Sequence, residues 1–415
     1  MNYLEKLLDG VEVKWKPLGD EVKVANIGVD KKINPIETKV RLLNFVDVFR
    51  NQYISNETPT MFVTANERKI VDCNIRKGDV FITPSSELID EIGFSAMAIE
   101  DIDNAVYSYH IMRLRINDKN VLSPSFLNYL FSSTDFRKQI RLKAQGITRF
   151  GLTQPNWKSL HIPIPPLTIQ KKIVRILDNF AKLTAELTAE LTARKKQYNY
   201  YREQLFSFDE KDAERLPMGN DTIGKFIRGS GLQKKDFTES GIGCIHYGQI
   251  YTYYGTYTDR TKSYVSEEFA KKARKAKHGN LVIATTSEND DDVCKAVAWL
   301  GNSEIAVSSD ACFYTHNLNP KYVAYFFQTK QFQKQKSPFI TGTKVRRVNA
   351  DDLAKIKIPV PSPEEQERIA NILDKFDILT SSISEGLPKE INLRKKQYEH
   401  YRDLLLTFPK DNLMA

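Results

Sequence analysis

The stretch IVRILDNFAKLT, which begins at Ile173, returns 196 positions later as IANILDKFDILT, which begins at Ile369. A second stretch repeats in the same way, because RKKQYNYYREQLFSF from Arg194 is followed by RKKQYEHYRDLLLTF from Arg394. Two parts of one chain do not reach this identity by chance, so the sequence contains an internal duplication. We therefore expect two copies of one structural unit.

The repeat extends upstream at lower identity. KGDVFITPSSE from Lys77 matches HGNLVIATTSE from His278, and Gly146 falls opposite Gly342. Each half is therefore a variable segment of roughly 150 residues followed by a nearly constant one of roughly 50 residues. The predicted boundaries are 1–155 and 210–350 for the variable domains, and 156–209 and 351–415 for the helical regions.

The nearly constant segments have the apolar spacing of long amphipathic helices. Steps of three and four residues place apolar side chains on one stripe of a helix. The first stripe consists of Ile173, Ile176, Leu177, Phe180, Leu183, Leu187, Leu191, Tyr198, Tyr201 and Leu205. The second consists of Ile369, Ile372, Leu373, Phe376, Leu379, Ile383, Ile391, Tyr398, Tyr401 and Leu405. Gly386-Leu387-Pro388 interrupts the second stripe, and we expect a break or kink there.

So narrow a stripe on so long a helix requires a partner. Some 40 helical residues make a rod of roughly 60 Å, and each constant segment is the natural partner of the other. We expect the two helices to pair, with the two ILD-bearing segments alongside each other. The alternative is a pair of unrelated surface helices on separate domains.

The variable segments combine short strands with helices. DVFITP, NLVIAT and HIMRLRI are rich in β-branched or aromatic residues and are bounded by Gly, Pro, Asn or Ser, as strands are. SPSFLNYLFSSTDFRKQI and NPKYVAYFFQTKQFQKQ have the pattern of amphipathic helices that begin at Ser or Asn. A mixed α/β domain is therefore predicted in each half.

The composition favours a polyanionic partner. The chain has a net charge of +9 and a pI near 9.0, and nucleic acid is the commonest partner of basic proteins. The four cysteines show neither a CxxC pair nor a close histidine, which argues against a zinc site and a disulfide framework and favours a reducing cytoplasm. The start MNYLEKLLDG is unlike a signal peptide, and the sequence contains no run of eighteen apolar residues, so we expect no membrane span.

The duplicated pattern of a variable region, IPIPP…Q, an ILD-containing helix and RKKQYxYYRxQL resembles the specificity subunit of type I restriction–modification enzymes. The resemblance covers essentially the whole chain. It implies an α+β fold in which two pseudo-repeated α/β target recognition domains are separated by a long antiparallel two-helix coiled coil. It also implies that each domain reads one half of a bipartite site on double-stranded DNA.

The resemblance further implies partners that carry the chemistry. Two modification (methyltransferase) subunits would dock on the helices, one per half, and motor-nuclease restriction subunits would complete the enzyme. S-adenosylmethionine, ATP and Mg²⁺ would then belong to those subunits, with no cofactor, metal or catalytic residue in this chain.

Two smaller features belong to the same picture. LTAELTAEL from Leu183 contains TAEL twice in tandem, which resembles a branch of the family where the number of tetrapeptides tracks the spacer between half-sites. Four helical residues turn about 400°, a net rotation of about 40°, which is close to the twist of one base pair. In addition, NYLEKLL near the start echoes YYREQLF before the second variable unit, so the N-terminal segment would complete the scaffold beside the C-terminal one.

Three pairs of loops are candidates for contacting DNA, since base edges give sequence information and phosphates bind cations. The loops after GDVFI and GNLVI, where the family tends to place groove-reading residues, hold Ser85, Ser86, Glu87, Thr286, Ser287 and Glu288. The loop expected after LLNFVDV and its counterpart in CIHYGQIYTYYGTY hold Asn44, Asp47, Arg50, Tyr247, Gln249 and Tyr251. The glycine-anchored basic loops, expected at phosphates, hold Thr148, Arg149, Lys344, Arg346 and Arg347.

Two other functions stay open at this point. A stand-alone methyltransferase or nuclease would need a catalytic tetrapeptide such as N/D-P-P-Y/F or a nuclease carboxylate–lysine cluster, and neither is evident; a phosphate loop for ATP is missing too. A coiled-coil adaptor would bind protein through the variable domains instead of DNA. S-adenosylmethionine binding by the chain alone would reveal the enzyme, and salt-dependent duplex binding would separate the specificity subunit from the adaptor.

Overall fold

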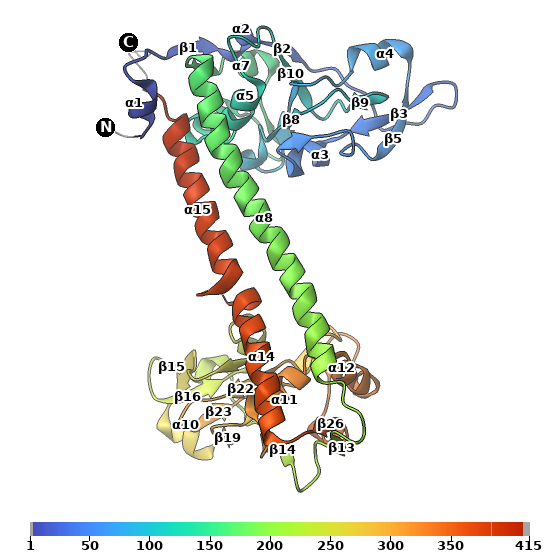
Figure 1. Cartoon of the computed structure of the whole chain (residues 1–415), viewed down its shortest axis with the longest axis vertical. Helices are drawn as coiled ribbons and strands as arrows, with labels where there is room; N and C mark the ends of the chain where they lie inside the picture. Colours follow the sequence, from blue (N-terminus) through green and yellow to red (C-terminus); the bar gives the residue numbers. More distant parts are fainter. Residues whose placement is uncertain (1–2, 383, 410–415) are drawn as a thin grey trace. The chain divides into compact units, whose positions relative to one another are not determined.

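The computed structural model describes residues 3–382 and 384–409. The chain folds into two compact units, of which the first contains Met1–Glu186 and Ile391–Ala415 and the second contains Leu187–Glu390. Each unit therefore combines one variable segment with parts of both helical segments. Figure 1 shows these elements along the chain.

The same five-stranded sheet forms in both units. The first has the order β2-β10-β6-β8-β4: Val22–Ala25, Met112–Ile116, Val80–Ile82, Ser95–Ala98 and Tyr53–Ile54. The second has the order β14-β24-β20-β22-β17: Gly224–Arg228, Ala311–His316, Leu281–Ala284, Ala296–Trp299 and Tyr257–Thr258. In each sheet the last pair is parallel and the others are antiparallel. The duplication seen in the sequence is thus a duplication of topology.

The central strand of each sheet is buried on both faces, as its continuous run of apolar residues requires. Because successive side chains on a strand point to opposite faces, Val80 and Ile82 of β6 enter one core while Phe81 enters another. Leu281 and Ile283 of β20 face one core in the same way, and Val282 faces a second.

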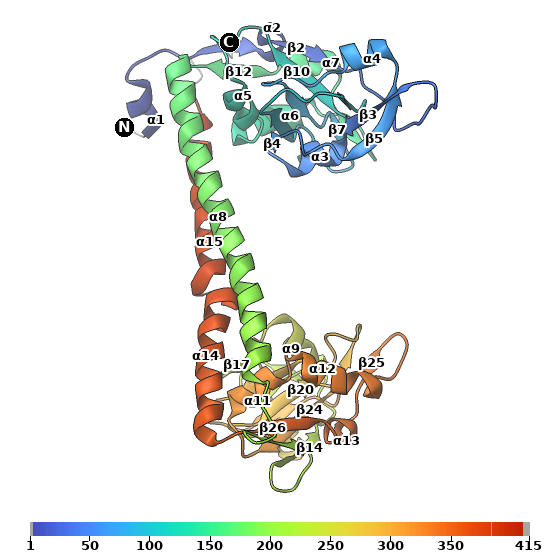
Figure 2. The same ribbon diagram turned by 45° about the vertical axis from the view of Figure 1, so that its right-hand side comes forward.

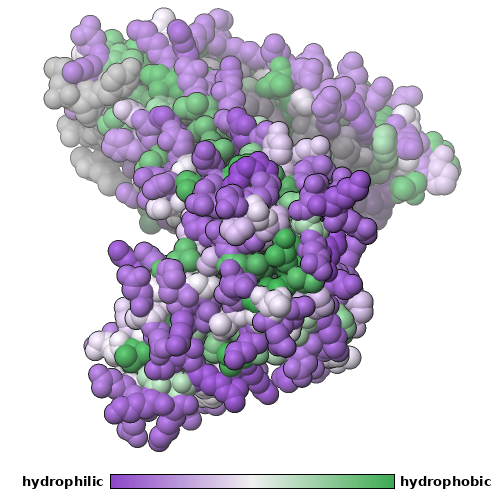
Figure 3. Space-filling view, turned by 60° about the horizontal axis from the view of Figure 1, so that its bottom comes forward, coloured by the Kyte–Doolittle hydropathy of each residue, from purple (hydrophilic) through white to green (hydrophobic). Residues whose placement is uncertain are grey.

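A second sheet covers one face, and it is larger in the second unit. In the first unit it has the order β5-β3-β9: Met61–Ala65, Thr38–Leu43 and Ala105–Tyr107. In the second it has the order β15-β18-β16-β23-β19: Phe237–Thr238, Ser263–Val265, Ile242–Ile245, Ile305–Val307 and Lys275–Ala276. The two variable segments therefore share a central sheet and differ at the periphery. The nearer surface in Figure 3, which belongs to the second unit, is mostly hydrophilic, with hydrophobic residues in small groups.

Each predicted amphipathic helix of the variable segments is two helices. SPSFLNYLFSSTDFRKQI forms α5 (Pro124–Leu130) and α6 (Thr134–Lys143), and its counterpart forms α11 (Pro320–Phe326) and α12 (Lys330–Lys336). The second helix of each pair has its own N-cap, because Ser133 Oγ accepts from Phe136 N and Thr329 Oγ1 accepts from Phe332 N. These caps break one apolar pattern into two helices.

The expectation of a strand followed by a loop at LLNFVDV was wrong. Strand β3 ends at Leu43, and α3 (Phe45–Arg50) follows at once. Asn44 caps this helix in a reciprocal capping box, in which Asn44 Oδ1 accepts from Asp47 N at 3.3 Å and Asp47 Oδ2 accepts from Asn44 N at 2.9 Å. The counterpart forms α9 (Tyr247–Thr252), which His246 caps.

The first constant segment is a single helix, α8 (Leu167–Leu205), which passes from the first unit into the second. Figures 1 and 2 show α15 (Gly386–Leu406) beside its first part and α14 (Pro363–Ser381) beside its last part. Phe180 stacks on Tyr401 in the first unit, with 5.2 Å between ring centroids, and Tyr198 and Tyr201 stack on Phe376 in the second. The predicted pairing of the two helical segments is confirmed within each unit.

The pairing is antiparallel, as the resemblance implies. The two ILD tripeptides fall in different units, and each packs near the tyrosine-bearing part of the other constant segment. Antiparallel pairing gives this result, since the start of one helix meets the end of the other. The predicted stripe residue Ile383 lies outside the described residues.

The predicted break in the second helical segment is confirmed, because α14 ends at Ser381 and α15 begins at Gly386. Gly386 has φ +73°, and a Cβ at this position would lie 2.3 Å from the carbonyl oxygen of Ile378. Only glycine fits this left-handed turn against the preceding helix.

The N-terminal segment completes the first unit beside the end of α15, as its faint echo of YYREQLF predicts. Leu4 and Leu8 of α1 (Tyr3–Leu8) belong to the same core as Leu405 and Leu406. Further along, Trp15 Nε1 donates to the carbonyl oxygen of Pro409 at 2.9 Å. In that stretch β1 (Lys14–Pro17) pairs with β12 (His161–Ile164), as β13 (Glu214–Pro217) pairs with β26 (Lys357–Val360) in the second unit.

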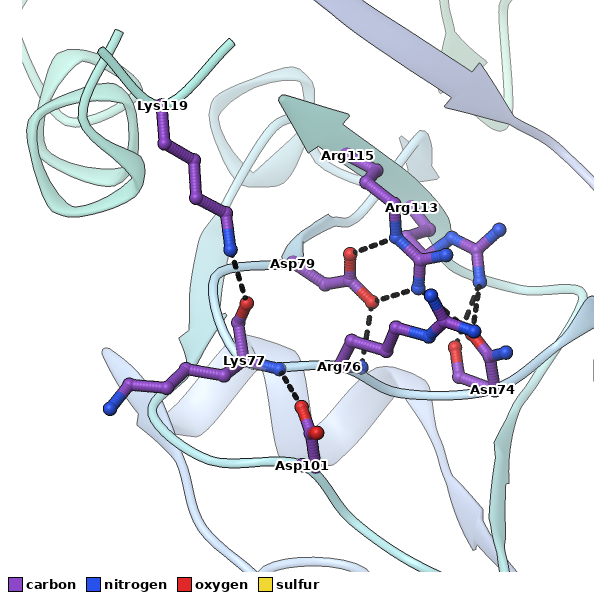
Figure 4. A network of polar contacts seen from close by, with 8 residues as sticks. All are labelled: Asn74, Arg76, Lys77, Asp79, Asp101, Arg113, Arg115 and Lys119. Carbon is purple, nitrogen blue, oxygen red and sulfur yellow. Dashed lines mark hydrogen bonds and ion pairs between the residues drawn. The ribbon is translucent and has the colours of Figure 1, made fainter. Parts of the chain in front are cut away.

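A polar network at the start of β6 distinguishes the first unit from the second (Figure 4). Arg115 holds the buried Asp79 carboxylate through two contacts of 2.6 Å, and Arg76 N donates to the same carboxylate at 2.8 Å. The strand register places Asn280 and Thr315 at the equivalent positions of the second unit, where Thr315 Oγ1 lies 3.4 Å from Asn280 Oδ1. A charged pair in one unit thus replaces a neutral pair in the other.

We predict that Asp79→Asn destabilises the chain and that Asp79→Asn with Arg115→Thr restores most of the loss. The single change leaves a partly buried guanidinium without its carboxylate, which costs about 2–3 kcal/mol in the free energy of unfolding. The double change recreates the neutral pair of the second unit. Urea unfolding followed by circular dichroism measures both, and a double variant no more stable than the single one would contradict the interpretation.

Candidate nucleic-acid interface

In each unit two of the predicted DNA-contacting loops lie side by side. β7 (Ser85–Ser86) pairs with β11 (Phe150–Gly151), next to Thr148 and Arg149. β21 (Thr286–Ser287) pairs with β25 (Arg346–Arg347). Each loop after the central strand is therefore joined to a basic loop from far along the chain, a juxtaposition that local sequence patterns do not reveal.

The basic loops turn at matching glycines. Gly146 has φ +130° and Gly342 has φ +88°. A Cβ would lie 2.0 Å from the carbonyl oxygen of Arg149 in the first case and 2.2 Å from that of Val345 in the second. The predicted glycine anchors are confirmed as positions where a side chain does not fit.

In the first unit the candidates divide into inward and outward groups. Ser86 is buried, and its Oγ donates to Glu91 Oε2 at 2.6 Å, so it stabilises the loop from within. Arg149 Nε donates to Ser85 Oγ at 3.1 Å and ties the two loops together. Glu87, Thr148 and Arg149 are exposed and available to a ligand.

The second unit shows the same division with more charge. Thr286 is buried, whereas Glu288, Lys344 and Arg347 are exposed. Arg346 Nε lies 2.8 Å from Asp290 Oδ1, and Arg346 Nη1 donates to the carbonyl oxygen of Gly342 at 2.5 Å. Arg346 therefore braces the basic loop against its neighbour, and the exposed cations beside it are Lys344 and Arg347.

The third pair of candidates lies on α3 and α9. Asn44 is occupied as the cap of α3, and Arg50 at the helix end is exposed. Gln249 is occupied as well, since its side chain accepts from His246 N at 3.0 Å and donates to Ser263 Oγ at 2.7 Å. The sequence identified these positions without revealing that two of the side chains fold the helices.

A pocket in the second unit unites the remaining candidates. Tyr251 Oη donates to the carbonyl oxygen of Thr286 at 2.8 Å and fixes α9 against β21. The pocket beside this contact is lined by Tyr247, Tyr251, Thr286, Ser287 and Glu288, together with Asn289, Asp292, Lys295 and Val345. Asn289, Asp292 and Lys295 were not among the predicted residues. Donors and acceptors in one hollow have the chemistry that base edges require.

Three further findings concern metal-binding groups, cysteines and helix hydropathy in the described residues. Among them, no three His, Cys, Asp or Glu side chains are grouped to hold a metal ion. The four cysteines are free and buried. None of the helices in the described part of the chain is sufficiently long and apolar to cross a membrane.

Comparison with known proteins identifies the family. The model of the type I restriction modification DNA specificity domain matches residues 18–194 and again 223–393. The chain belongs to this family. The double match coincides with the duplication read from the sequence.

Relatives of full length support the assignment. The chain is 33% identical over 425 residues to a type I restriction enzyme specificity subunit of Escherichia coli, with 100% of this chain and 99% of the relative covered. It is 32% identical over 434 residues to a Haemophilus influenzae protein described as a type I restriction enzyme specificity subunit, with 98% of each covered.

Two solved structures share the fold. The S subunit of a type I restriction–modification system from M. genitalium matches with a TM-score of 0.53 and 14% identity, covering 97% of this chain and 98% of that one. A chain from a study of type I R-M complex assembly matches with a TM-score of 0.61 and 14% identity, covering 95% and 98%. The α+β fold with two repeated domains and long paired helices is therefore that of the specificity subunits.

Within this specificity-subunit fold, each ILD tripeptide supplies an aspartate that holds the helix to the globular part of its unit. Asp178 Oδ1 accepts from Tyr53 Oη and, at 2.7 Å, from Tyr129 Oη. In the second unit Asp374 Oδ1 accepts from Tyr325 Oη at 2.7 Å. Burial, reinforced by the carboxylate, raises the pKa of Tyr129 and Tyr325 well above the usual range and keeps both phenols as donors.

We call this contact between the long helix and the globular part the joint. In the second unit the joint also contains a cation, because Lys321 Nζ forms an ion pair with Asp374 Oδ2. A buried glutamine completes the joint in both units: Gln170 accepts from Ser123 N, and Gln366 accepts from Asn319 N, each at 2.8 Å. Ser123 and Asn319 are the N-cap residues of α5 and α11, the helices that carry Tyr129 and Tyr325. The two glutamines therefore orient these helices. The duplicated ILD and PPxxxQ-like motifs thus fix each globular part to the helical scaffold.

Proposed function

We propose that this chain is the DNA-reading subunit of a type I restriction–modification enzyme and that each variable domain reads one half of a bipartite site. The observation that carries the proposal is the repeated pairing of a polar loop with a basic loop, β7 with β11 and β21 with β25. Two such readers in one chain suit a target with two parts. The net charge of +9 suits its polyanionic backbone.

Membership of the family supports a division of labour along the chain. We propose that residues 1–155 and 210–350 recognise DNA and that 156–209 and 351–415 form the scaffold. Two modification subunits would bind this scaffold and restriction subunits would join them in the cytoplasm, since the relatives are named as subunits of type I restriction enzymes. S-adenosylmethionine, ATP and Mg²⁺ would bind those partners, and this chain would have no catalytic role.

We also propose that the two TAEL tetrapeptides of α8 set the spacing of the half-sites. They lie in an uninterrupted helix that belongs to both units. Their leucines, Leu187 and Leu191, are half-buried, while Ala189 and Glu190 between them are exposed. A tetrapeptide can therefore be added with its leucine close to the same stripe.

Methylome sequencing of cells that express this chain with its modification subunit tests the proposal. We expect methylation at a single interrupted motif with two defined half-sites. Cells that carry the modification subunit alone are the control. Methylation that does not depend on this chain, or a chain that binds S-adenosylmethionine and methylates duplexes unaided, would contradict it.

We predict that Arg347→Ala weakens binding to all duplexes alike and reduces the salt dependence. One lost phosphate contact lowers the slope of log K against log salt by about 0.9. Arg346→Ala is the matched control, because its guanidinium already pairs with Asp290 and a smaller change in slope is expected. Fluorescence anisotropy over a salt series measures both. A loss confined to one base of the motif would show that Arg347 reads sequence instead.

A further inference from the structure

The loop that follows β21 in the second unit folds around a buried ammonium. Lys336, the last residue of α12, donates through Nζ to the carbonyl oxygens of Asp290 at 2.8 Å, Val293 at 2.9 Å and Asp291 at 3.3 Å. Its exposed fraction is 1%. Thr286 and Ser287 of β21 and Glu288 at the start of this loop line the pocket beside α9.

This arrangement costs free energy that an apolar residue would save. Burial lowers the pKa of Lys336, which shows the direction of the desolvation penalty, while the carboxylates of Asp290, Asp291 and Asp292 act in the opposite direction. All three N–H donors of the ammonium have carbonyl partners, so the charge is held by the loop backbone. The contact therefore fixes the path of the loop.

The first unit reaches the same result with a different residue. Arg137 of α6 donates through Nη1 to the carbonyl oxygen of Ile92 and through Nη2 to that of Asp90. These carbonyls belong to the loop after β7, the counterpart of the loop after β21.

The position of the cation on the helix differs between the units. Gln139 and Gln335 are equivalent, since each donates to the carbonyl oxygen of the first residue of a scaffold strand, His161 in β12 and Lys357 in β26. By this alignment the counterpart of Lys336 is Ile140, which is buried and apolar, and the counterpart of Arg137 is Gln333. The positions of Arg137 and Lys336 on their helices differ by about one helical turn, but both side chains bind carbonyl oxygens of the equivalent loop. We call this contact between a helix cation and the loop backbone the clamp, and both units have it.

Both loops end in a left-handed turn, which is strained only in the second unit, where the residue is not glycine. Gly93 has φ +74° and Cys294 has φ +71° at the equivalent position. The left-handed conformation is costly for cysteine, and it persists only where surrounding contacts hold it.

We propose that Lys336 and Arg137 are positioning residues that hold the sequence-reading loops in their binding conformation and so set base specificity without contacting DNA. This inference rests on the proposed function. It adds to that function a residue pair outside the interface and assigns one half-site to each cation. Replacing one of these cations should reduce the base preference at one half-site and leave the other half-site unchanged.

Selection from a randomised duplex library by the full chain assembled with its modification subunits tests the inference. For Lys336→Ile, which installs the residue found in the first unit, we expect at least a tenfold loss of preference at one half-site. The other half-site motif and the affinity for random duplex should be unchanged. Lys336→Ile with Gln333→Arg rebuilds the clamp of the first unit, and we expect it to restore the motif.

A purely structural role would give different results. Unchanged motifs in Lys336→Ile, or equal loss at both half-sites, would overturn the inference while leaving the proposed function intact. A wild-type assembly that selects no bipartite motif would overturn the proposed function. Should Lys336→Ile fail to assemble, Arg137→Gln and its rescue by Ile140→Lys decide the same question in the first unit, and failure of that rescue would overturn the inference.

Discussion

A chain with one further Thr-Ala-Glu-Leu inserted after Leu191 should methylate sites whose half-sites are unchanged and whose spacer is longer by about one base pair. Four helical residues rotate one end of α8 by a net of about 40° relative to the other, close to the twist of one base-pair step. Because the added leucine lies near the apolar stripe, the helix pairing should survive. Methylation of the original sites should be lost entirely.

The control for this prediction is an insertion of Thr-Ala alone at the same place. Two residues turn the helix by about 200°, which puts the stripe on the wrong side and should abolish recognition of any bipartite site. Methylome sequencing distinguishes the three chains. An unchanged spacer in the tetrapeptide variant would show that α8 does not set the distance.

Asp374→Leu should lower the free energy of unfolding by about 3–5 kcal/mol, because it leaves the ammonium of Lys321 without its carboxylate partner in a largely buried contact. The aspartate is 9% exposed, and it binds both Lys321 and the fully buried Tyr325. Urea unfolding of the chain measures the loss. Adding Lys321→Met and Tyr325→Phe removes the stranded groups, and this triple variant should recover much of the stability.

Asp352→Ala provides the matched control for that change. Asp352 pairs with Lys355 at 2.7 Å on the surface, where Lys355 is 62% exposed, so its loss should cost less than about 1 kcal/mol. If both variants lost the same free energy of unfolding, the contact between the helix and the globular part would contribute no more to stability than a surface ion pair.

The features that the sequence reveals are those with a local or a repeated pattern. The duplication follows from repeated stretches, whereas the apolar stripe of α8 and the break before Gly386 follow from neighbouring residues; all three are confirmed. The capping box at Asn44 and Asp47 was also readable, since the two residues stand three apart before an apolar run. It was missed because the preceding strand pattern runs into it.

The features that the sequence hides depend on pairing across long distances. Ser86 and Phe150 are strand partners, and no local signal links two segments so far apart. Lys336 is a charged residue in a polar stretch, for which exposure is the usual expectation. The candidate loops were identified, but the contacts that join and clamp them required coordinates.

The charged pair of Asp79 and Arg115, equivalent to the neutral pair of Asn280 and Thr315, bears on where the two units can be joined in a chimera. A chimera that joins β6 of the first unit to β24 of the second would combine Asp79 with Thr315 and leave a buried carboxylate without its guanidinium. A crossover within the duplicated helices keeps each matched pair intact. Chimeras of the two units should therefore fold best when they are joined within the repeated helical segments, where the two halves of this chain are most alike.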